Sequence, residues 1–399
     1  MNARRNHRLR LFSAAVLFMS LMFGSIGFIT PIAAVHAEEP IKIGAFFALS
    51  GPAATIGTPS KLVAQMVVDK INQAGGINNR PLQLILADNE SDPTKALTVA
   101  KRLVENDKVI ALIGPDRTDS GMAVKPYIEK VQIPTLMTVG GDPVITVPTF
   151  RWVFKTPQRT SVAAKKTYEY LKSQNRTKIA LITATDGFGK DGLKWLEQLA
   201  PEYGLEIVSS EAFAATDTDM TPQLVKIKDS PAQALVCWTI GPAGALVAKN
   251  VKQLGIKIPL IQCHGQPDPK YIELAGEASE GSIMPSTKLM VANQLPDNDP
   301  QKAVILEFMR LYKEVYHYDQ QYPINTHSGY AWDAIYLLAN AMRQAGTDPE
   351  ALRSAIEQTK GYVGISGIYS LSPEDHNGLD TSSMVMVKIE KGQWVLLQP

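Results

Sequence analysis

From Ile41 onward, short apolar runs alternate with longer segments whose apolar residues recur at helical spacing. This alternation predicts β-α-β units, which build a parallel sheet with helices on both faces. The first helix is predicted to have Thr58 as its N-cap and Pro59 as its first residue, and to stop before Gly75-Gly76. The other elements expected in this half are strands at 41–47, 82–87, 109–113 and 135–139, and helices at 93–106 and 121–130.

The same alternation resumes after residue 156 and predicts a second doubly wound sheet. Its expected strands are 179–183, 205–210, 234–238 and 260–263, and its expected helices are 161–173, 190–203, 221–228 and 243–254. The segment 281–290 is expected to carry the chain back across, before helices at 300–316, 327–345 and 348–359 and strands at 368–371, 383–390 and 393–397. The predicted fold is therefore α/β with two doubly wound lobes, which suits a chain of 399 residues.

The first 37 residues have the features of an export signal. Four arginines within the first ten residues precede an apolar run over 11–29, and the small residues Val35 and Ala37 stand just before Glu38. This order predicts cleavage after Ala37 and a periplasmic location; an uncleaved membrane anchor is the alternative. Without these arginines, 36 Lys and Arg face 39 Asp and Glu, so the mature chain is not expected to bind nucleic acid.

The two cysteines, Cys237 and Cys263, are expected on successive strands of the second sheet. Export permits a disulfide between them, but the side-chain directions of neighbouring parallel strands often do not suit one. The sequence leaves both a bridge and two buried thiols open.

A glycine loop, Gly187-Phe188-Gly189-Lys190-Asp191-Gly192, lies between an expected strand and helix, and Glu211 ends the following strand. This spacing is typical of dinucleotide binding and supports an NAD(P)-dependent oxidoreductase as an alternative function. A tight strand-to-helix turn also needs glycines. The sequence has no metal-ligand spacing, P-loop or nucleophile elbow, so we expect a protein that is not an enzyme and holds no cofactor or metal.

Loops rich in glycine and hydroxyl side chains follow the expected strands, directly before helix N-termini. They are Ser50–Pro52, Gly114–Ser120 and Thr138–Asp142 in the first lobe, and Asp186–Gly189 and Trp238–Pro242 in the second. Ligands of open α/β sheets bind at these carboxyl ends, and the free N–H groups of a helix N-terminus favour a carboxylate. The alternative for Thr118, Asp119 and Ser120 is that they only cap a helix.

Motifs spread over Ile41–Pro399 resemble the periplasmic substrate-binding proteins of branched-chain amino-acid type ABC importers. They are Ile41-Lys42-Ile43-Gly44, Leu49-Ser50-Gly51-Pro52, Gly57, Asn72-x-x-Gly75-Gly76-Ile77, Leu112-Ile113-Gly114-Pro115, Ser120, Ile133-Pro134, Asp186-x-Phe188-Gly189, Gly255 and Ala331-Trp332-Asp333-Ala334. The resemblance implies the type I periplasmic-binding (Venus-flytrap) fold, with two α/β lobes that are joined by three crossovers and close on a ligand by a hinge. On this basis residues 38–156 and 287–362 form lobe 1, and residues 157–286 and 363–399 form lobe 2.

The resemblance also implies which residues hold a ligand. It assigns the ligand carboxylate to Ser120 and to the loop of Thr138, Val139, Gly140 and Gly141, and it makes Phe188-Gly189 a cleft loop. Trp238 falls at the family's lobe-two tyrosine, and His327 falls where the family has an apolar side chain. The remaining predicted ligand-binding residues are Ser50, Asp119, His264, Gly265 and Gln266.

Two positions depart from the family pattern. The family's hydroxyl-bearing Thr falls at Gly141, and its ammonium-binding Glu falls near Gly265. A buried ammonium without a carboxylate is unfavourable by several kcal/mol, so the ligand is either an amino acid held by another acid (Asp268, Asp186 or Asp119) or an aromatic or other apolar carboxylic acid. Both remain open.

The function that follows is a monomeric solute receptor that delivers its ligand to the membrane permease and ATPase of an ABC importer. The alternatives are a ligand-binding sensor and the oxidoreductase described above. No second apolar stretch long enough to span a membrane follows the export signal.

Overall fold

The computed structural model describes residues 39–146, 151–214 and 216–397. The predicted export signal, residues 1–37, lies outside these residues. Within the part described, no helix combines the length and the apolar character needed to cross a bilayer.

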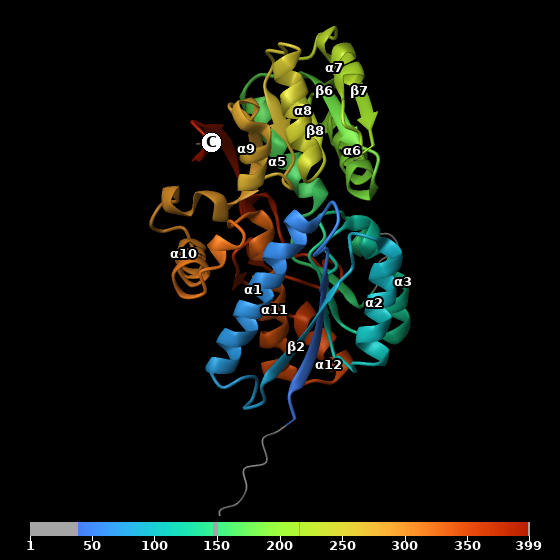
Figure 1. Cartoon of the computed structure of the whole chain (residues 1–399), viewed down its shortest axis with the longest axis vertical. Coiled ribbons are helices and arrows are strands. Elements are labelled where there is room, and N and C mark those ends of the chain that lie inside the picture. Colours follow the sequence, from blue (N-terminus) through green and yellow to red (C-terminus); the bar gives the residue numbers. More distant parts are fainter. Residues whose placement is uncertain (1–38, 147–150, 215, 398–399) are drawn as a thin grey trace, which may run out of the picture. The chain divides into compact units, whose positions relative to one another are not determined.

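The first sheet is parallel throughout and has the strand order β2-β1-β3-β4-β5. Its strands are β1 (Ile41–Phe47), β2 (Leu82–Asp88), β3 (Leu112–Ile113), β4 (Thr135–Met137) and β5 (Val153–Lys155). The helices α1 (Ala54–Gln73) and α11 (Thr326–Ala345) cover one face, and α2 (Pro93–Glu105) and α3 (Thr118–Val131) cover the other (Figure 1). Because helices cover both faces, six of the seven residues of β1 are buried.

The second sheet has the order β14-β13-β10-β9-β8-β6-β7. The strands β6 (Lys178–Ala184), β7 (Glu206–Phe213), β8 (Ala234–Trp238), β9 (Leu260–Gln262) and β10 (Ile283–Thr287) are parallel, and β13 (Met384–Glu390) and β14 (Gln393–Leu396) are antiparallel additions. Its helices are α5 (Thr160–Ser173) and α6 (Gly187–Leu199) on one face and α7 (Thr221–Lys228), α8 (Pro242–Gln253) and α9 (Pro269–Ala275) on the other.

The chain passes between the sheets three times: after β5, after β10 and before β13. The remaining elements are α4 (Pro143–Thr146), α10 (Lys302–Arg310), α12 (Pro349–Glu357) and the hairpin of β11 (Tyr362–Val363) and β12 (Ile368–Tyr369). Before the last crossing, the Ile365 N–H donates to Asp333 on α11, and the Asn377 amide donates to the Lys155 carbonyl on β5. The predicted α/β architecture of two doubly wound sheets flanked by helices is confirmed, and the second sheet has two antiparallel strands at one edge.

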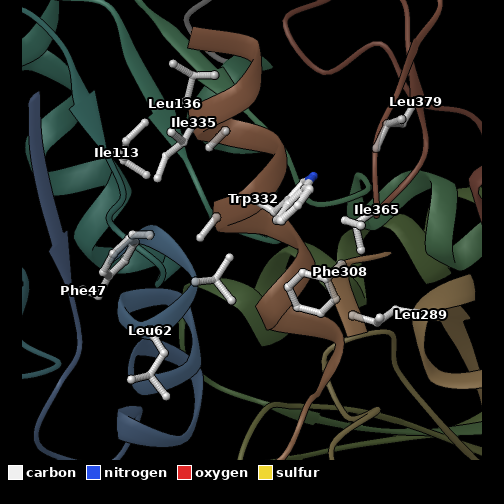
Figure 2. Packing of buried hydrophobic residues seen from close by; sticks show 14 of the residues in the cluster. Phe47, Leu62, Ile113, Leu136, Leu289, Phe308, Trp332, Ile335, Ile365 and Leu379 are labelled. Atoms are coloured by element: carbon white, nitrogen blue, oxygen red, sulfur yellow. The ribbon is translucent and has the colours of Figure 1, made fainter. Parts of the chain in front are cut away.

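Helix α11 is buried on several sides, which explains why its sequence is apolar around most of its circumference. Figure 2 shows Ile335 facing Ile113 and Leu136 of the first sheet, while Trp332 lies on the side of Ile365. The Trp332 ring also meets Phe308 of α10 edge to face, with centroids 5.5 Å apart.

Two predicted helices differ most from the structure in their boundaries. Helix α1 begins at Ala54, five residues before the predicted start, so Pro59 lies inside it. A proline leaves the carbonyl four residues earlier without its helical partner, and here the Thr55 carbonyl accepts instead from the Asn325 amide at 3.3 Å. The predicted helix 300–316 is an α-helix only over Lys302–Arg310 and continues as a π-helical turn, Leu311–Val315.

Candidate functional site

A cavity lies where the topological switch points of the two sheets meet. In the first sheet the switch point lies between β1 and β3, and in the second it lies between β6 and β8, because the connections that follow these neighbouring strands run to opposite sides of the sheet. Its free volume is about 370 Å³ when the part that is open to solvent is included. The residues that line it are Ile56, Asp116, Arg117, Thr118, Thr138, Gly140, Pro157, Phe188, Ile240, His264, Gly265, His327 and Tyr330.

The N-terminus of α3 faces the cavity. The helix begins at Thr118, and its N-cap residue, Arg117, makes no side-chain capping hydrogen bond. The Thr118 hydroxyl is buried and has no hydrogen-bond partner among the described residues, whereas the Thr138 hydroxyl donates to the Pro115 carbonyl at 3.3 Å. The first turn of α3 and Thr118 therefore offer donors to an anionic group.

Asp116 is a cavity residue that the sequence analysis missed. It follows β3, and its Oδ2 accepts the Ala48 N–H from the end of β1 at 2.9 Å. Its Oδ1 is buried without a hydrogen-bond partner. Burial raises the pKa of Asp116 to about 6, although hydrogen bonds and the Arg117 charge oppose the shift. In the sequence, Asp116 could have been singled out because it stands three residues after a strand that ends at the switch point.

Two histidines from different lobes line the cavity without charge at neutral pH. Within the part of the chain that the structure describes, neither ring nitrogen of His264 has a hydrogen-bond partner, and burial, assisted by the charges of Lys155 and His327, lowers the pKa of His264 to about 3. His327 Nε2 lies 3.2 Å from the Gly265 carbonyl oxygen, and burial lowers the pKa of His327 to about 4. A neutral imidazole presents one donor and one acceptor.

The rest of the cavity wall is apolar or aromatic. Ile56 and Tyr330 come from the first lobe's helices, Phe188 comes from the first turn of α6, and Ile240 comes from the loop after β8. Phe188 and His264 have ring centroids 5.4 Å apart. Trp238 packs behind them, 5.5 Å from His264, and does not line the cavity.

Two glycines allow the walls to approach. A Cβ on Gly140 would stand 2.8 Å from the Phe188 ring, and one on Gly265 would stand 2.6 Å from the Ile240 side chain. The Gly140 carbonyl is held from behind by the buried Lys155 ammonium at 2.6 Å. Burial lowers the pKa of Lys155 to about 8, against the attraction of Asp142.

Several predicted site residues lie beside the cavity rather than on its wall. Ser50 donates to Asp88 at 2.7 Å. Ser120 is buried with an unpartnered hydroxyl, and Val139 packs in the core under α3. A Cβ on Gly141 would meet the Thr118 side chain at 2.6 Å. Gln266 donates to the Thr239 and Gly241 carbonyls, which fixes the loop after β8.

The three acids considered as replacements for the family's Glu accept hydrogen bonds from other parts of the protein. Asp119 accepts the Gly187 N–H at 3.1 Å and so joins α3 of one lobe to α6 of the other. Asp186 caps α6 by accepting from the Gly189 N–H. Asp268 caps α9 and accepts from the Asn325 amide at 2.8 Å. None of them lines the cavity.

The glycine loop at 187–192 has a packing role. A Cβ on Gly189 would lie 1.9 Å from the Ala184 carbonyl oxygen, and one on Gly192 would lie 2.3 Å from the Trp238 ring. These glycines let α6 start tightly against β6 and β8, as the structural alternative predicts. Cys237 and Cys263 are buried free thiols.

Comparisons with known proteins agree with this architecture. A family model described as "Periplasmic binding protein" matches residues 40–393. The leucine-, isoleucine-, valine-, threonine- and alanine-binding protein of Pseudomonas aeruginosa is 22% identical over 322 residues, which are 80% of this chain and 83% of that protein.

Solved structures are similar over 90% of this chain. An extracellular ligand-binding receptor from Rhodopseudomonas palustris has a TM-score of 0.82 and 26% identity, with 100% of that chain covered. A branched-chain amino acid transporter substrate-binding protein from Streptococcus pneumoniae, in complex with isoleucine, has a TM-score of 0.78 and 25% identity, also with 100% covered. With both sheets, the cavity between them and the family match over residues 40–393 in agreement, this chain belongs to the periplasmic binding protein family, among the relatives of the Leu/Ile/Val-binding proteins.

Proposed function

We propose that the protein captures a small carboxylate-bearing ligand in the cavity between its two sheets and delivers it to an ABC importer. The observation that carries this proposal is the set of unpartnered polar groups at the cavity wall. The Thr118 hydroxyl and the His264 ring are buried and free, and α3 directs its uncapped N-terminus at the same space. A carboxylate supplies acceptors for all three.

The body of the ligand is expected to be apolar or aromatic. Ile56, Phe188, Ile240 and Tyr330 surround the cavity, and apolar walls with a few polar anchors are typical of small-molecule sites. Two ligand classes fit this description: branched-chain amino acids, which relatives are named for binding, and aromatic or other apolar carboxylic acids. Delivery to a permease and ATPase is inferred from the family, and we expect the receptor to act as a monomer.

A thermal-shift screen tests the proposal. The mature protein is unfolded and refolded to remove carried ligand, then heated with amino acids, substituted benzoates, phenylacetates, aliphatic acids and amides. A ligand that binds only the folded state raises Tm. We expect carboxylates to raise it and the matching amides to leave it unchanged.

The anchor is tested by the Thr118→Val variant, which keeps the shape of the side chain and removes the hydroxyl. Its affinity for the acid found in the screen should fall about tenfold. Thr98→Val is the matched control, because the exposed Thr98 hydroxyl donates to the Thr94 carbonyl of its own helix. A screen in which no carboxylate raises Tm would overturn the proposal.

A further inference from the structure

Asp116 needs a hydrogen-bond donor that the carboxylate of a ligand does not supply. Among residues 39–146, 151–214 and 216–397, the buried side-chain atoms at the cavity wall without a hydrogen-bond partner are the Thr118 hydroxyl, both His264 nitrogens and Asp116 Oδ1. A hydroxyl and a neutral imidazole each contain a donor, whereas an ionised carboxylate only accepts. A ligand that consists of a carboxylate and hydrocarbon satisfies the first two groups and leaves Asp116 Oδ1 without a donor.

The protein itself does not neutralise Asp116. Among the described residues, no basic side chain forms an ion pair with it. Arg117 is directed to the Ser91 carbonyl and to Asp119 and Asp186. The Lys155 ammonium is held by the Gly140 and Gln158 carbonyls. The Asn89 amide favours the charged form of Asp116, but among the described residues neither the Asn89 amide nitrogen nor Asp116 Oδ1 has a hydrogen-bond partner of normal geometry.

The Asp116 side chain is also fixed in position. Only 4% of the residue is exposed, and the hydrogen bond from the Ala48 N–H ties Oδ2 to the end of β1. Oδ1 therefore cannot turn to solvent without breaking that bond. A buried charged acceptor that loses its partner is costly, so a site of this kind discriminates strongly against ligands that lack the donor.

We infer that Asp116 is a specificity-determining residue, and that the ligand is a carboxylic acid that also carries a hydrogen-bond donor, an amino or hydroxyl group, which Asp116 accepts. The inference rests on the proposed function and narrows it. An amino acid meets the requirement through its ammonium, with Asp116 in place of the acid missing at Gly265, and a hydroxylated aromatic or aliphatic acid meets it through its hydroxyl. Unsubstituted apolar acids do not.

The test compares acids that differ only in the donor. Isothermal titration of the ligand-free protein measures the affinity for each acid and for its analogue without the donor. Leucine is compared with 4-methylpentanoate, and 4-hydroxybenzoate is compared with benzoate and 4-methoxybenzoate. Any other acid found in the screen is compared with its own analogue that lacks the donor. For the class that binds, we expect the acid with the donor to bind at least about 30-fold more tightly than its analogue. The pair that shows this preference identifies the donor as an ammonium or a hydroxyl.

Two variants assign the preference to Asp116. Asp116→Leu should reduce the ratio to below about threefold. Asp116→Asn keeps an oxygen for the Ala48 N–H and turns the other atom into a donor, so it should reduce the ratio even if the Leu variant does not fold. Asp92→Asn, at the cap of α2 where the side chain accepts only from the Lys95 N–H, is the control and should keep the wild-type ratio.

The outcomes separate the two ideas. If acids without a donor bind the wild-type protein as tightly as their partners, or if both Asp116 variants keep the wild-type ratio, the inference is wrong while the proposed function stands. If no carboxylic acid binds, the proposed function fails and the inference fails with it.

Discussion

Single residues set how closely the elements around the cavity approach one another. The Trp238 ring packs directly against the backbone of Gly192 and leaves no room for a Cβ there. Phe188 packs in this manner against Gly140, and Ile240 packs in this manner against Gly265. The Trp238 and Phe188 rings are buried and have little room to move, and Ile240 is partly buried. Changes of one methyl group are therefore expected to matter here.

Gly192→Ala should lower the free energy of unfolding by about 1–3 kcal/mol. The added Cβ would stand 2.3–2.5 Å from three atoms of the Trp238 ring, which is fully buried. Urea unfolding followed by tryptophan fluorescence measures the change. Lys190→Ala, at an exposed position of the same helix, is the control. Equal stability of wild type and Gly192→Ala would show that the ring can move aside.

His264 should make the protein less stable in acid. Its pKa is about 3 in the folded state and about 6.5 in an unfolded chain. As the pH falls from 7 to 5, the unfolded chain therefore takes up a proton that the folded protein does not, and the group's contribution falls by about 2 kcal/mol. The free energy of unfolding of His264→Gln, taken as a difference from wild type, should therefore be about 2 kcal/mol higher at pH 5 than at pH 7. Parallel pH profiles of unfolding for the two proteins would contradict this.

At the scale of elements, the entry to α11 connects three parts of the chain. Asn325 caps α11 in a capping box with Ser328. Its amide donates to Asp268, the cap of α9, and to the Thr55 carbonyl that Pro59 leaves free in α1. The Asn325 side chain thus makes hydrogen bonds at the start of α11, at the cap of α9 and at the proline in α1. A change at Asn325 is therefore expected to affect the stability of all three helices.

Asn325→Asp should lower the free energy of unfolding by about 2–4 kcal/mol at pH 7. The carboxylate still accepts the Ser328 N–H, but it has no donor for Asp268 and faces it with a like charge. Burial already raises the pKa of Asp268 to about 6, and a second carboxylate raises it further, so the folded variant takes up a proton as the pH falls.

The loss in Asn325→Asp should therefore be smaller at pH 5 than at pH 7. The same change at Asn340, which accepts only from the Arg343 side chain on the surface of α11, is the control. Denaturant unfolding at the two pH values gives both comparisons. An equal loss at both pH values would show that repulsion from Asp268 is not the cause.

At the scale of the whole molecule, polar contacts join the two lobes beside the cavity. The Gly187 N–H of α6 donates to Asp119 of α3, and the Asp142 N–H after β4 donates to Asp191 of α6 at 2.8 Å. Both contacts depend on the lobes being close together. They are expected to contribute to ligand affinity, since they form together with the walls of the cavity.

Asp119→Ala should weaken ligand binding about fivefold, because one hydrogen bond between the lobes contributes about 1 kcal/mol. The radius of gyration of the ligand-free variant in X-ray scattering should be larger than that of the wild type. Asp119→Asn keeps an oxygen acceptor for the Gly187 N–H and should stay close to wild type in both measurements. Unchanged affinity in Asp119→Ala would mean that the contact does not favour the closed arrangement.

The sequence by itself determined the α/β alternation, most of the elements and the family, because these follow from local periodicity and from motifs that are contiguous in the chain. It also placed Phe188, His264, Gly265 and His327 at the cavity. Only the tertiary structure decided which neighbours face the ligand space. Thr118 lines the cavity and Ser120 does not, since residues two apart on a helix point to nearly opposite sides. The Asp116 side chain is held at the cavity by the N–H of Ala48, which is 68 positions away in the chain. No local sequence pattern encodes a contact over that separation.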